Sequence, residues 1–316
     1  MQDKALREIL EQAHAAKKAG FDSLWVAQHH VTETELMFQP LPLLSRFSGD
    51  FPDMMLGTSS LLLALLNPVD VAEQVANIDI MCGGKFTLGV SIGYREKEFQ
   101  AFNLLKRYRV GRFVEGVEII RRLWTQDHVS FNGRHFKLED VSINPKPLQK
   151  SGPEIWIGGD TEPGVFRAGE IGDAWMISPR QSILHIRKLL AKYREGTSKR
   201  GRKKGKLLLM RELHVAQSSD VALMEAKPFL KQMYDTYLRW GQPGERYDLS
   251  FEELARGRYI VGDPTACIEE LSNYMKELQP DQISFRMTWP GMKHGDVVNS
   301  IRLFGEKIIP YFKEKS

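Results

Sequence analysis

The amino-acid sequence predicts an α/β fold, a TIM-type (β/α) barrel with insertions, and three observations support this prediction. Short apolar segments, typical of strands buried on both faces of a parallel sheet, alternate with helical patterns along the chain. The 316 residues suffice for such a barrel, which commonly needs about 250. The alternation continues without a break in composition, so we expect one domain over residues 1–316.

Helical patterns are clear in the first part of the chain. Before Gly20, a favoured residue just beyond a helix, apolar residues recur at helical spacing at Leu6, Ile9, Leu10, Ala13 and Ala16. Further helices are predicted near 69–81 and around 113–124, where apolar side chains share one face.

Seven segments have the composition of strands, one fewer than the eight that close a barrel. They cover residues 21–27, 54–60, 85–93, 154–159, 173–178, 206–217 and 282–289. Because the chain opens on a helical pattern, we expect the absent strand to be the first one, supplied from ahead of Met1 or replaced by another segment.

Two segments depart from the repeat and are predicted to be insertions. Residues 128–147 have the pattern of a β-hairpin, with Asn132–Gly133 as a favoured two-residue turn. Residues 219–262 are helical at first and then loop-like around 241–248. Long insertions in barrels often cover the active site, so we expect these two to shape the substrate pocket.

Composition excludes several classes of protein. The two cysteines, Cys82 and Cys267, lack metal-ligand spacing, so neither a disulfide framework nor a metal site is expected. The apolar stretches are too short for a membrane span and the start has no signal-peptide pattern, so we expect a cytoplasmic protein. The net charge is +4, and the basic run at 199–206 lacks aromatic residues, which favours a solvated loop over a nucleic-acid site.

Candidate site residues lie at the carboxyl ends of the predicted strands, where βα barrels carry their active sites. This rule selects a mixed set: Gln28, His29, His30, Ser59, Ser60, Ile92, Gly93, Tyr94, Gly158, Gly159, His214, Arg286 and Trp289. The sequence contains no GxGxxG after a strand, no P-loop and no GxSxG motif. It therefore indicates neither a nicotinamide-binding Rossmann unit nor a hydrolase nucleophile elbow.

The segment GGDTEPG, residues 158–164, joins a buried strand to a helix and could bind an anion. Pro163 suits the first helical turn, and Asp160 or Thr161 can cap the helix. The three glycines would let the backbone approach a phosphate, which barrels often bind near their late strands. A plain strand-to-helix turn explains the same residues, and Asp160 repels phosphate unless its side chain points away.

Two pairs of titratable residues could take part in catalysis. His29 and His30 are neighbours on a strand and point to opposite faces, which disfavours a metal site; one could transfer a proton, or both could be structural. Glu212 and His214 point inward by strand alternation, where a carboxylate and an imidazole need partners. A site role and a structural Glu–His or Glu–Arg pair are both open.

Several long segments together resemble the bacterial-luciferase-like superfamily over nearly the whole chain. FDSLWVAQHHV resembles the family's strand that ends in an acidic residue and two histidines, with Gln28 in place of the acid. GTSS resembles the strand with a non-prolyl cis peptide under the flavin ring, which would fall at Ser59–Ser60. Four further segments resemble the family's phosphate-side, final-helix and closing regions and occur in the same order as in the family. They are GGKFTLGVSIGYREKEF, GGDTEPGVFRAGEIGDAW, VGDPTACIEEL and QISFRMTWPGM.

The resemblance implies a flavin-dependent monooxygenase that uses reduced FMN and O2 to oxygenate a small organic substrate, with a separate flavin reductase as partner. It implies a phosphate site near Gly159, Gly164 and Arg109, and it makes His29 the residue that stabilises the oxygenated flavin or moves its proton. Ser91 stands at the family's reactive-cysteine position and Ile92 at the arginine that follows it in luciferases, which disfavours luciferase activity. The alternatives are a deazaflavin-dependent hydride-transfer enzyme and a flavin-binding protein without turnover.

The residue assignments from sequence divide into three groups, with no metal ligand among them. Cofactor binding is assigned to Ser59, Ser60, Gly93, Tyr94, Arg109, Gly158, Gly159, Asp160, Thr161 and Gly164. Catalysis is assigned to His29, His30, Glu212 and His214, and the substrate pocket to Arg286 and Trp289.

We also predict a homodimer, because luciferase-like enzymes commonly pair through helices near the start of the barrel. The corresponding helices here are the one before Gly20 and the one after Asn67. Light scattering at micromolar concentration should give twice the mass of one chain, and a purely monomeric mass would count against this prediction.

Overall fold

The computed structural model describes residues 2–33, 35–242 and 249–314, which form two compact units. The terminal unit comprises Met1–Asp22, Ile177–Ala191 and Lys206–Ser316, and the central unit comprises Ser23–Met176 and Lys192–Gly205. The helix α7 (Ile183–Lys199) contributes residues to both units.

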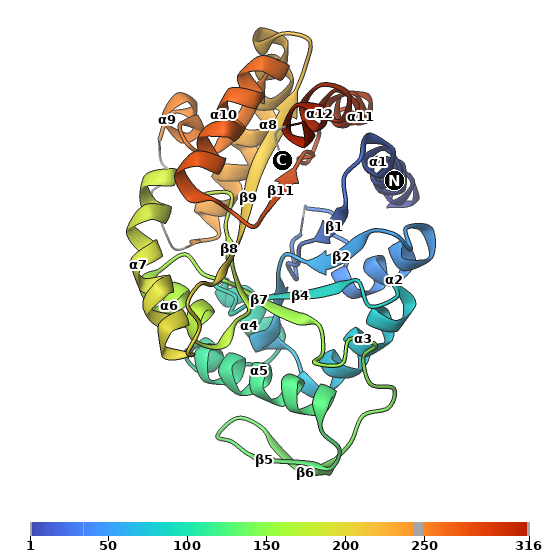
Figure 1. The fold of residues 1–316 in the computed structure, drawn as a ribbon, viewed down its shortest axis with the longest axis vertical. Coiled ribbons are helices and arrows are strands. Elements are labelled where there is room, and N and C mark those ends of the chain that lie inside the picture. Colours follow the sequence, from blue (N-terminus) through green and yellow to red (C-terminus); the bar gives the residue numbers. More distant parts are fainter. Residues whose placement is uncertain (1, 34, 243–248, 315–316) are drawn as a thin grey trace. The chain divides into compact units, whose positions relative to one another are not determined.

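The central unit is built on a parallel sheet, shown in Figure 1. Its main strands, in spatial order, are β1 (Ser23–Val26), β2 (Met55–Thr58), β4 (Phe86–Ser91), β7 (Glu154–Gly158) and β8 (Ala174–Ile177). Each lies within a predicted strand segment. The two-residue strand β3 (Leu61–Leu62) also pairs with the end of β4. Because all pairings are parallel, the carboxyl ends of neighbouring strands lie side by side.

Helices connect these strands, as the alternating pattern predicts. They are α2 (Pro40–Asp50), α3 (Pro68–Met81), α4 (Glu96–Ala101), α5 (Arg109–Thr125) and α6 (Glu162–Ile171), with 3-10 turns η1 (Leu63–Leu65) and η2 (Lys106–Tyr108). The start of α3 follows from local chemistry, because the Asn67 side chain accepts the Val69 N–H and Pro68 occupies the first turn. The predicted helices near 69–81 and 113–124 are confirmed.

The predicted hairpin is present, but its predicted turn is wrong. Strands β5 (Val129–Asn132) and β6 (Lys137–Val141) are antiparallel, and Asn132 pairs with Lys137, so the loop runs over residues 133–136. The Glu115 carboxylate on α5 accepts three successive backbone N–H groups of this loop, those of residues 134–136. This tertiary contact stabilises a wider turn than Asn132–Gly133 forms by itself.

The terminal unit contains a second set of parallel strands and their helices (Figure 1). The strand β9 (Lys206–Val215) pairs in parallel with β10 (Tyr259–Gly262) and β11 (Gln282–Arg286). The helices are α1 (Gln2–Ala19), α8 (Ser219–Arg239), α9 (Phe251–Ala255), α10 (Pro264–Leu278), α11 (His294–Leu303) and α12 (Ile309–Lys313), with a π-helical turn η3 (Phe304–Ile308) before α12.

Two strands, β10 and the two-residue β3, were not predicted from the sequence. The strand β10 falls inside the expected insertion 219–262, where four residues after a charged segment do not stand out from a loop. The helical first part of that insertion is confirmed as α8, whereas most of the loop-like part, residues 243–248, lies outside the described residues. Residues 2–19 are helical as predicted, and a strand ahead of Met1 stays a prediction.

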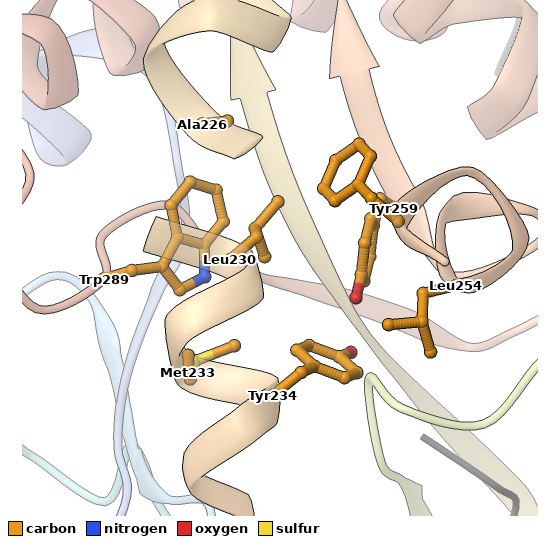
Figure 2. Close-up of a cluster of buried hydrophobic side chains, with 8 residues drawn as sticks. Ala226, Leu230, Met233, Tyr234, Leu254, Tyr259 and Trp289 are labelled. Carbon is orange, nitrogen blue, oxygen red and sulfur yellow. The ribbon is translucent and has the colours of Figure 1, made fainter. Parts of the chain in front are cut away.

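The core of the terminal unit is aromatic, as Figure 2 shows. Ala226, Leu230, Met233 and Tyr234 on α8 pack with Trp289 and with a group from the α9–β10 region. Tyr234 and Tyr259 meet edge to face with ring centroids 5.2 Å apart, a favourable aromatic geometry. This packing anchors the last turns of α8 next to the end of β11.

The basic run at 199–206 follows the end of α7 as a loop, as predicted. Two of its arginines pair with the carboxylate of Asp173. Arg202 Nη2 lies 2.8 Å from Asp173 Oδ1, and Arg200 Nη2 lies 3.2 Å from the same oxygen. The other carboxylate oxygen accepts from Arg121 at 2.6 Å and from the Ile155 N–H at 2.8 Å. Asp173 therefore ties α5, β7 and this loop to the start of β8.

We predict that Asp173→Asn lowers the free energy of unfolding by about 2–4 kcal/mol, because three arginines lose their shared carboxylate. Burial alone would raise the pKa of Asp173, but Arg121, the Ile155 N–H and Arg202 together lower it. A lowered pKa in the folded state stabilises the protein above about pH 3.9, the unfolded value, and this stabilisation is lost as the pH falls through the folded value.

Urea unfolding from pH 7 to pH 3 measures this difference, which should shrink below about pH 4. Asp127→Asn is the control, because Asp127 is largely exposed and pairs with Lys146 only at the surface, so its effect should stay below about 1 kcal/mol. An Asp173 variant as stable as the parent at pH 7 contradicts the prediction.

Candidate active site

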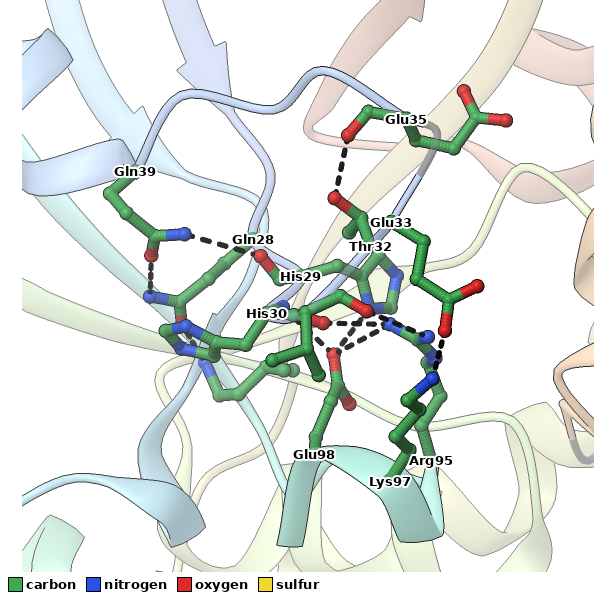
Figure 3. A network of polar contacts seen from close by, with 12 residues as sticks. Gln28, His29, His30, Thr32, Glu33, Glu35, Gln39, Arg95, Lys97 and Glu98 are labelled. Carbon is green, nitrogen blue, oxygen red and sulfur yellow. Dashed lines mark hydrogen bonds and ion pairs between the residues drawn. The ribbon is translucent and has the colours of Figure 1, made fainter. Parts of the chain in front are cut away.

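The two predicted site histidines are held by one buried carboxylate, that of Glu98 on α4 (Figure 3). Glu98 Oε1 lies 3.0 Å from His29 Nδ1 and accepts the His30 backbone N–H at 3.0 Å. Arg95 Nη1 is 3.5 Å from the same oxygen and donates to the His30 carbonyl at 2.9 Å. The turn after β1 is thus fastened to the start of α4.

The Glu98 side chain is fully buried, yet it is held in the charged form. Burial would raise the pKa of Glu98, but the hydrogen bond and charge of His29, the His30 N–H and Arg95 outweigh it and lower the pKa. Since an ionised carboxylate only accepts hydrogen bonds, its neighbours must act as donors.

Gln28 also stabilises the turn after β1, through hydrogen bonds to two other segments. Its Oε1 accepts the Leu62 N–H at 2.8 Å, and its Nε2 donates to Gln39 Oε1 at 2.8 Å. Gln39 in turn donates to the His29 carbonyl at 3.2 Å. Gln28, which stands where the resembled family has an acid, joins β1, β3 and the start of α2.

His29 and His30 lie in different surroundings, but they belong to the turn after β1 and not to the strand on which the sequence placed them, so strand alternation is not the reason. The His29 ring meets Tyr94 edge to face with centroids 5.8 Å apart. The His30 ring packs against Phe102, with centroids 4.6 Å apart, and lines a cavity of about 150 Å³ between α2 and α3. Burial lowers the pKa of His30, because attraction by Glu98 does not offset desolvation. His30 is therefore poorly suited to hold a proton.

The neighbouring strand ends bring further predicted residues to the same edge of the sheet. The Ser59–Ser60 peptide is cis, as the resemblance implies, and the Ser59 N–H donates to the Val26 carbonyl at 2.8 Å. A Cβ on Gly158 would lie 3.5 Å from the Ser91 Cβ and 3.9 Å from the Ser60 hydroxyl. Gly93 follows β4 with a φ of +70°, which favours glycine.

Two arginines, Arg109 at the start of α5 and Arg167 in the second turn of α6, are close enough for their charges to repel. Arg167, on α6, has its pKa lowered first by burial and also by repulsion from Arg109, while Glu170 opposes the shift. Arg109 Nη1 donates to the Lys106 carbonyl at 3.2 Å, whereas its buried Nε has no hydrogen-bond partner within the described part of the chain. Two cations that repel each other favour an anion between them.

The helix start itself is also open to an anion. Thr161 is the N-cap residue of α6, but its side chain makes no capping hydrogen bond, and Asp160 precedes it at the end of β7. Gly159 also has a packing role: a Cβ there would lie 2.8 Å from the Gly164 carbonyl carbon. The two glycines therefore allow α6 to pack tightly against β7.

In the terminal unit, Glu212 forms an ion pair with Arg286, which is the Glu–Arg alternative that the sequence left open. Its buried carboxylate accepts from Arg286 Nε at 2.8 Å and from the Trp289 indole N–H at 2.7 Å. Burial would lower the pKa of Arg286, but the Glu212 charge raises it well above the usual value. Arg286 Nη1 also donates to the Tyr237 hydroxyl at 2.6 Å. Arg286 and Trp289, predicted to line the substrate pocket, are thus both bound to Glu212.

His214 also has a carboxylate partner in the terminal unit. Its Nε2 lies 2.7 Å from Glu225 Oε2 on α8, and its buried Nδ1 has no hydrogen-bond partner among the described residues. Glu225 lines a cavity of about 140 Å³ between α8 and α11. The predicted Glu–His pairing therefore exists, but with Glu225 in place of Glu212.

Several residues of these sites were not found from the sequence: Arg95, Glu98, Arg167 and Glu225. Each is a charged residue near a helix start or on a helix, where charges usually face solvent. Only the fold shows that they are turned toward a site. Among the described residues there is no cluster of metal ligands, and no helix there is long and apolar enough to cross a membrane.

Comparisons with known proteins show which proteins the chain is similar to. The alkanal monooxygenase alpha chain of a Kryptophanaron alfredi symbiont is 22% identical over 349 residues, which cover 100% of this chain and 95% of that relative. The F420-dependent glucose-6-phosphate dehydrogenase of Nakamurella multipartita is 26% identical over 329 residues, covering 96% and 91%. The crystal structure of monooxygenase RslO1 from Streptomyces bottropensis has the same fold, with a TM-score of 0.90 at 20% identity, covering 99% and 95%.

The likeness in structure confirms the predicted α/β fold with a parallel sheet, the fold of luciferase-like TIM-barrel enzymes. The profile of the luciferase-like monooxygenase family matches residues 1–281, most of the chain. The chain therefore belongs to the luciferase-like monooxygenase family.

Proposed function

We propose that the protein is a flavin-dependent monooxygenase that uses reduced FMN and O2 to oxygenate a small organic substrate. Two observations support this proposal: Arg109, at the start of α5, repels Arg167 in the second turn of α6, and the N-cap side chain of α6 makes no capping hydrogen bond. Neighbouring cations and a positive helix end both favour an anion such as the phosphate of a flavin mononucleotide. The central unit that holds this pair also holds His29 and the Ser59–Ser60 strand end.

The residues of the central unit fit such a cofactor. Arg109 has a buried Nε that no described residue accepts from, and the backbone N–H groups at the start of α6 lack a side-chain cap. The flavin ring would lie over the Ser59–Ser60 strand end. Bound reduced flavin would supply the electrons that activate O2, and the chain's own residues would bind it, orient it and handle protons.

His29 is the group best placed to move a proton. Its Nδ1 side is occupied by Glu98, which fixes the ring, and its edge lies near Tyr94 at the end of β4. An imidazole can take up a proton on one ring nitrogen and release it again, which is the requirement for a general acid or base. His30, turned toward Phe102, would support the turn instead.

A second candidate is hydride transfer with the deazaflavin coenzyme F420 in place of oxygenation. Relatives that carry F420 in their names are similar over nearly the whole chain, as is the alkanal monooxygenase relative. Both reactions need an anion site and a proton-transfer residue, so the same groups support either. A flavin-binding protein without turnover is the third alternative.

Mixing the purified protein with reduced FMN or reduced F420, with and without O2, separates these functions. Oxygen-dependent product formation with reduced FMN supports the monooxygenase, and a flavin reductase should then sustain repeated turnover. Oxygen-independent hydride transfer with F420 supports the second candidate.

The first prediction from this proposal concerns Arg109→Ala. It should weaken binding of reduced FMN by about 1–3 kcal/mol, the usual effect of losing a charge-assisted hydrogen bond to phosphate. Anaerobic titration measures the dissociation constant. Arg122→Ala is the matched control, because Arg122 lies on the same helix, is exposed and pairs with Glu118, so its affinity should equal that of the parent. Unchanged affinity in Arg109→Ala would remove this residue from the phosphate site.

The second prediction concerns His29→Ala, which should leave cofactor affinity unchanged and lower turnover about a hundredfold, because a proton-transfer group typically contributes that much to the rate. Stopped-flow and steady-state kinetics measure the two effects separately. His30→Ala serves for comparison and should lower turnover less. Full turnover in His29→Ala means that another group moves the proton.

A further inference from the structure

We propose that Glu98 is a positioning residue that fixes His29 as the tautomer with its hydrogen on Nδ1, so that Nε2 is the nitrogen that exchanges a proton in the reaction. The tautomer is a property of the protein alone. Its use in catalysis rests on the proposed function.

The first argument is the chemistry of the contact between the two side chains. Glu98 Oε1 and His29 Nδ1 are 3.0 Å apart, and the Glu98 side chain is fully buried. A buried carboxylate in its charged form offers lone pairs and no proton, so Nδ1 must donate. In a neutral imidazole one nitrogen donates and the other accepts, and the hydrogen bond made by one determines the state of the other.

The second argument is that this carboxylate cannot turn away. The same oxygen that receives Nδ1 also accepts the His30 backbone N–H, and Arg95 lies 3.5 Å from it. Arg95 donates in addition to the His30 carbonyl. Rotating Glu98 would leave a buried N–H and a buried guanidinium without this acceptor, at a cost of about 1–3 kcal/mol for each buried group. The position of His29 is therefore set by three contacts on one atom (Figure 3).

The third argument concerns the hydrogen bonding of the other carboxylate oxygen of Glu98. Glu98 Oε2 is buried and has no hydrogen-bond partner among the residues that the structure describes. All of the hydrogen bonding that keeps the carboxylate charged is thus concentrated on the oxygen that faces His29 and His30. A charge placed there stabilises an imidazolium more than a neutral imidazole.

The proton transfer can then be written in full. An O–H group of the reacting molecule or of a water gives its proton to Nε2; the O–H bond breaks and an N–H bond forms. The hydrogen on Nδ1 stays in place, and the resulting imidazolium lies against the Glu98 carboxylate. In the reverse step Nε2 returns its proton to an oxygen atom. No oxidant or reductant takes part, and Glu98 keeps its charge throughout.

A purely structural Glu98 would hold the turn without setting the tautomer, and two variants distinguish the possibilities. Glu98→Gln keeps the shape but removes the charge, and the neutral amide can donate or accept toward Nδ1. Glu98→Asp keeps the charge on a shorter side chain. Glu96→Gln is the control, because Glu96 lies on the same helix with its side chain largely exposed and pairs with Lys106.

The tautomer is measured by NMR of imidazole nitrogens in histidine-labelled protein without cofactor, at alkaline pH, with His29→Asn identifying the signal. We expect the hydrogen on Nδ1 in the parent, in Glu98→Asp and in Glu96→Gln, and a shift toward hydrogen on Nε2 in Glu98→Gln. Hydrogen on Nε2 in the parent or in Glu98→Asp overturns the proposal. If Glu98→Gln fails to fold by circular dichroism, the parent and Glu98→Asp spectra decide it.

Kinetics test the catalytic part of the proposal. Glu98→Gln should lower kcat about tenfold or more and change its pH profile, with less than a threefold change in cofactor affinity, and Glu98→Asp should restore part of kcat. A Glu98→Gln variant with the predicted tautomer shift but parental kcat and pH profile overturns the catalytic part. If no variant or parent oxygenates any substrate while the tautomer shift is observed, the proposed function fails and the tautomer assignment holds.

Discussion

A single buried carboxylate constrains the polar edge of the central unit. Glu98 lies on the short helix after β4, and its partners His29 and His30 lie after β1, so one oxygen atom joins two strand ends. A buried charge is tolerated only where donors surround it, which requires these strand ends to keep their spacing. The uncharged Gln28 side chain stabilises the same turn by hydrogen bonds to Gln39 and to the Leu62 N–H. The adjacent histidines consequently differ in environment although they are neighbours in the chain.

The charged groups of the protein fall into two kinds, and the difference separates structure from function. Asp173 and Glu212 are matched by arginines within their own units, so these groups stabilise the fold. Arg109 and Arg167 instead lie near enough to repel each other, and this repulsion adds to the burial that lowers the pKa of Arg167. Such an arrangement is unfavourable until an anion binds, which is why we attribute it to a cofactor.

The two types of relative, monooxygenase and F420-dependent dehydrogenase, differ in chemistry but share physical requirements. Either reaction needs an anion site that fixes the cofactor and a side chain that exchanges protons at a defined atom. The central unit supplies candidates for both within one parallel sheet whose strand ends lie side by side. The same groups can therefore serve either proposed reaction, and the experiments with reduced FMN and reduced F420 distinguish oxygenation from hydride transfer.

Local patterns in the sequence were sufficient for most of the strands, because buried parallel strands are short apolar runs, and for the helix that ends before Gly20. They also led to His29 and, through the resemblance, to the cis peptide at Ser59–Ser60. They did not predict β10, which is short and follows charged residues, nor the loop at 133–136, whose shape depends on Glu115. Glu98 could not be recognised because its partner His29 is 69 positions away, and a charged residue on a helix is normally solvated. Only the tertiary structure decides which charges are buried and paired, since that depends on the packing of distant segments.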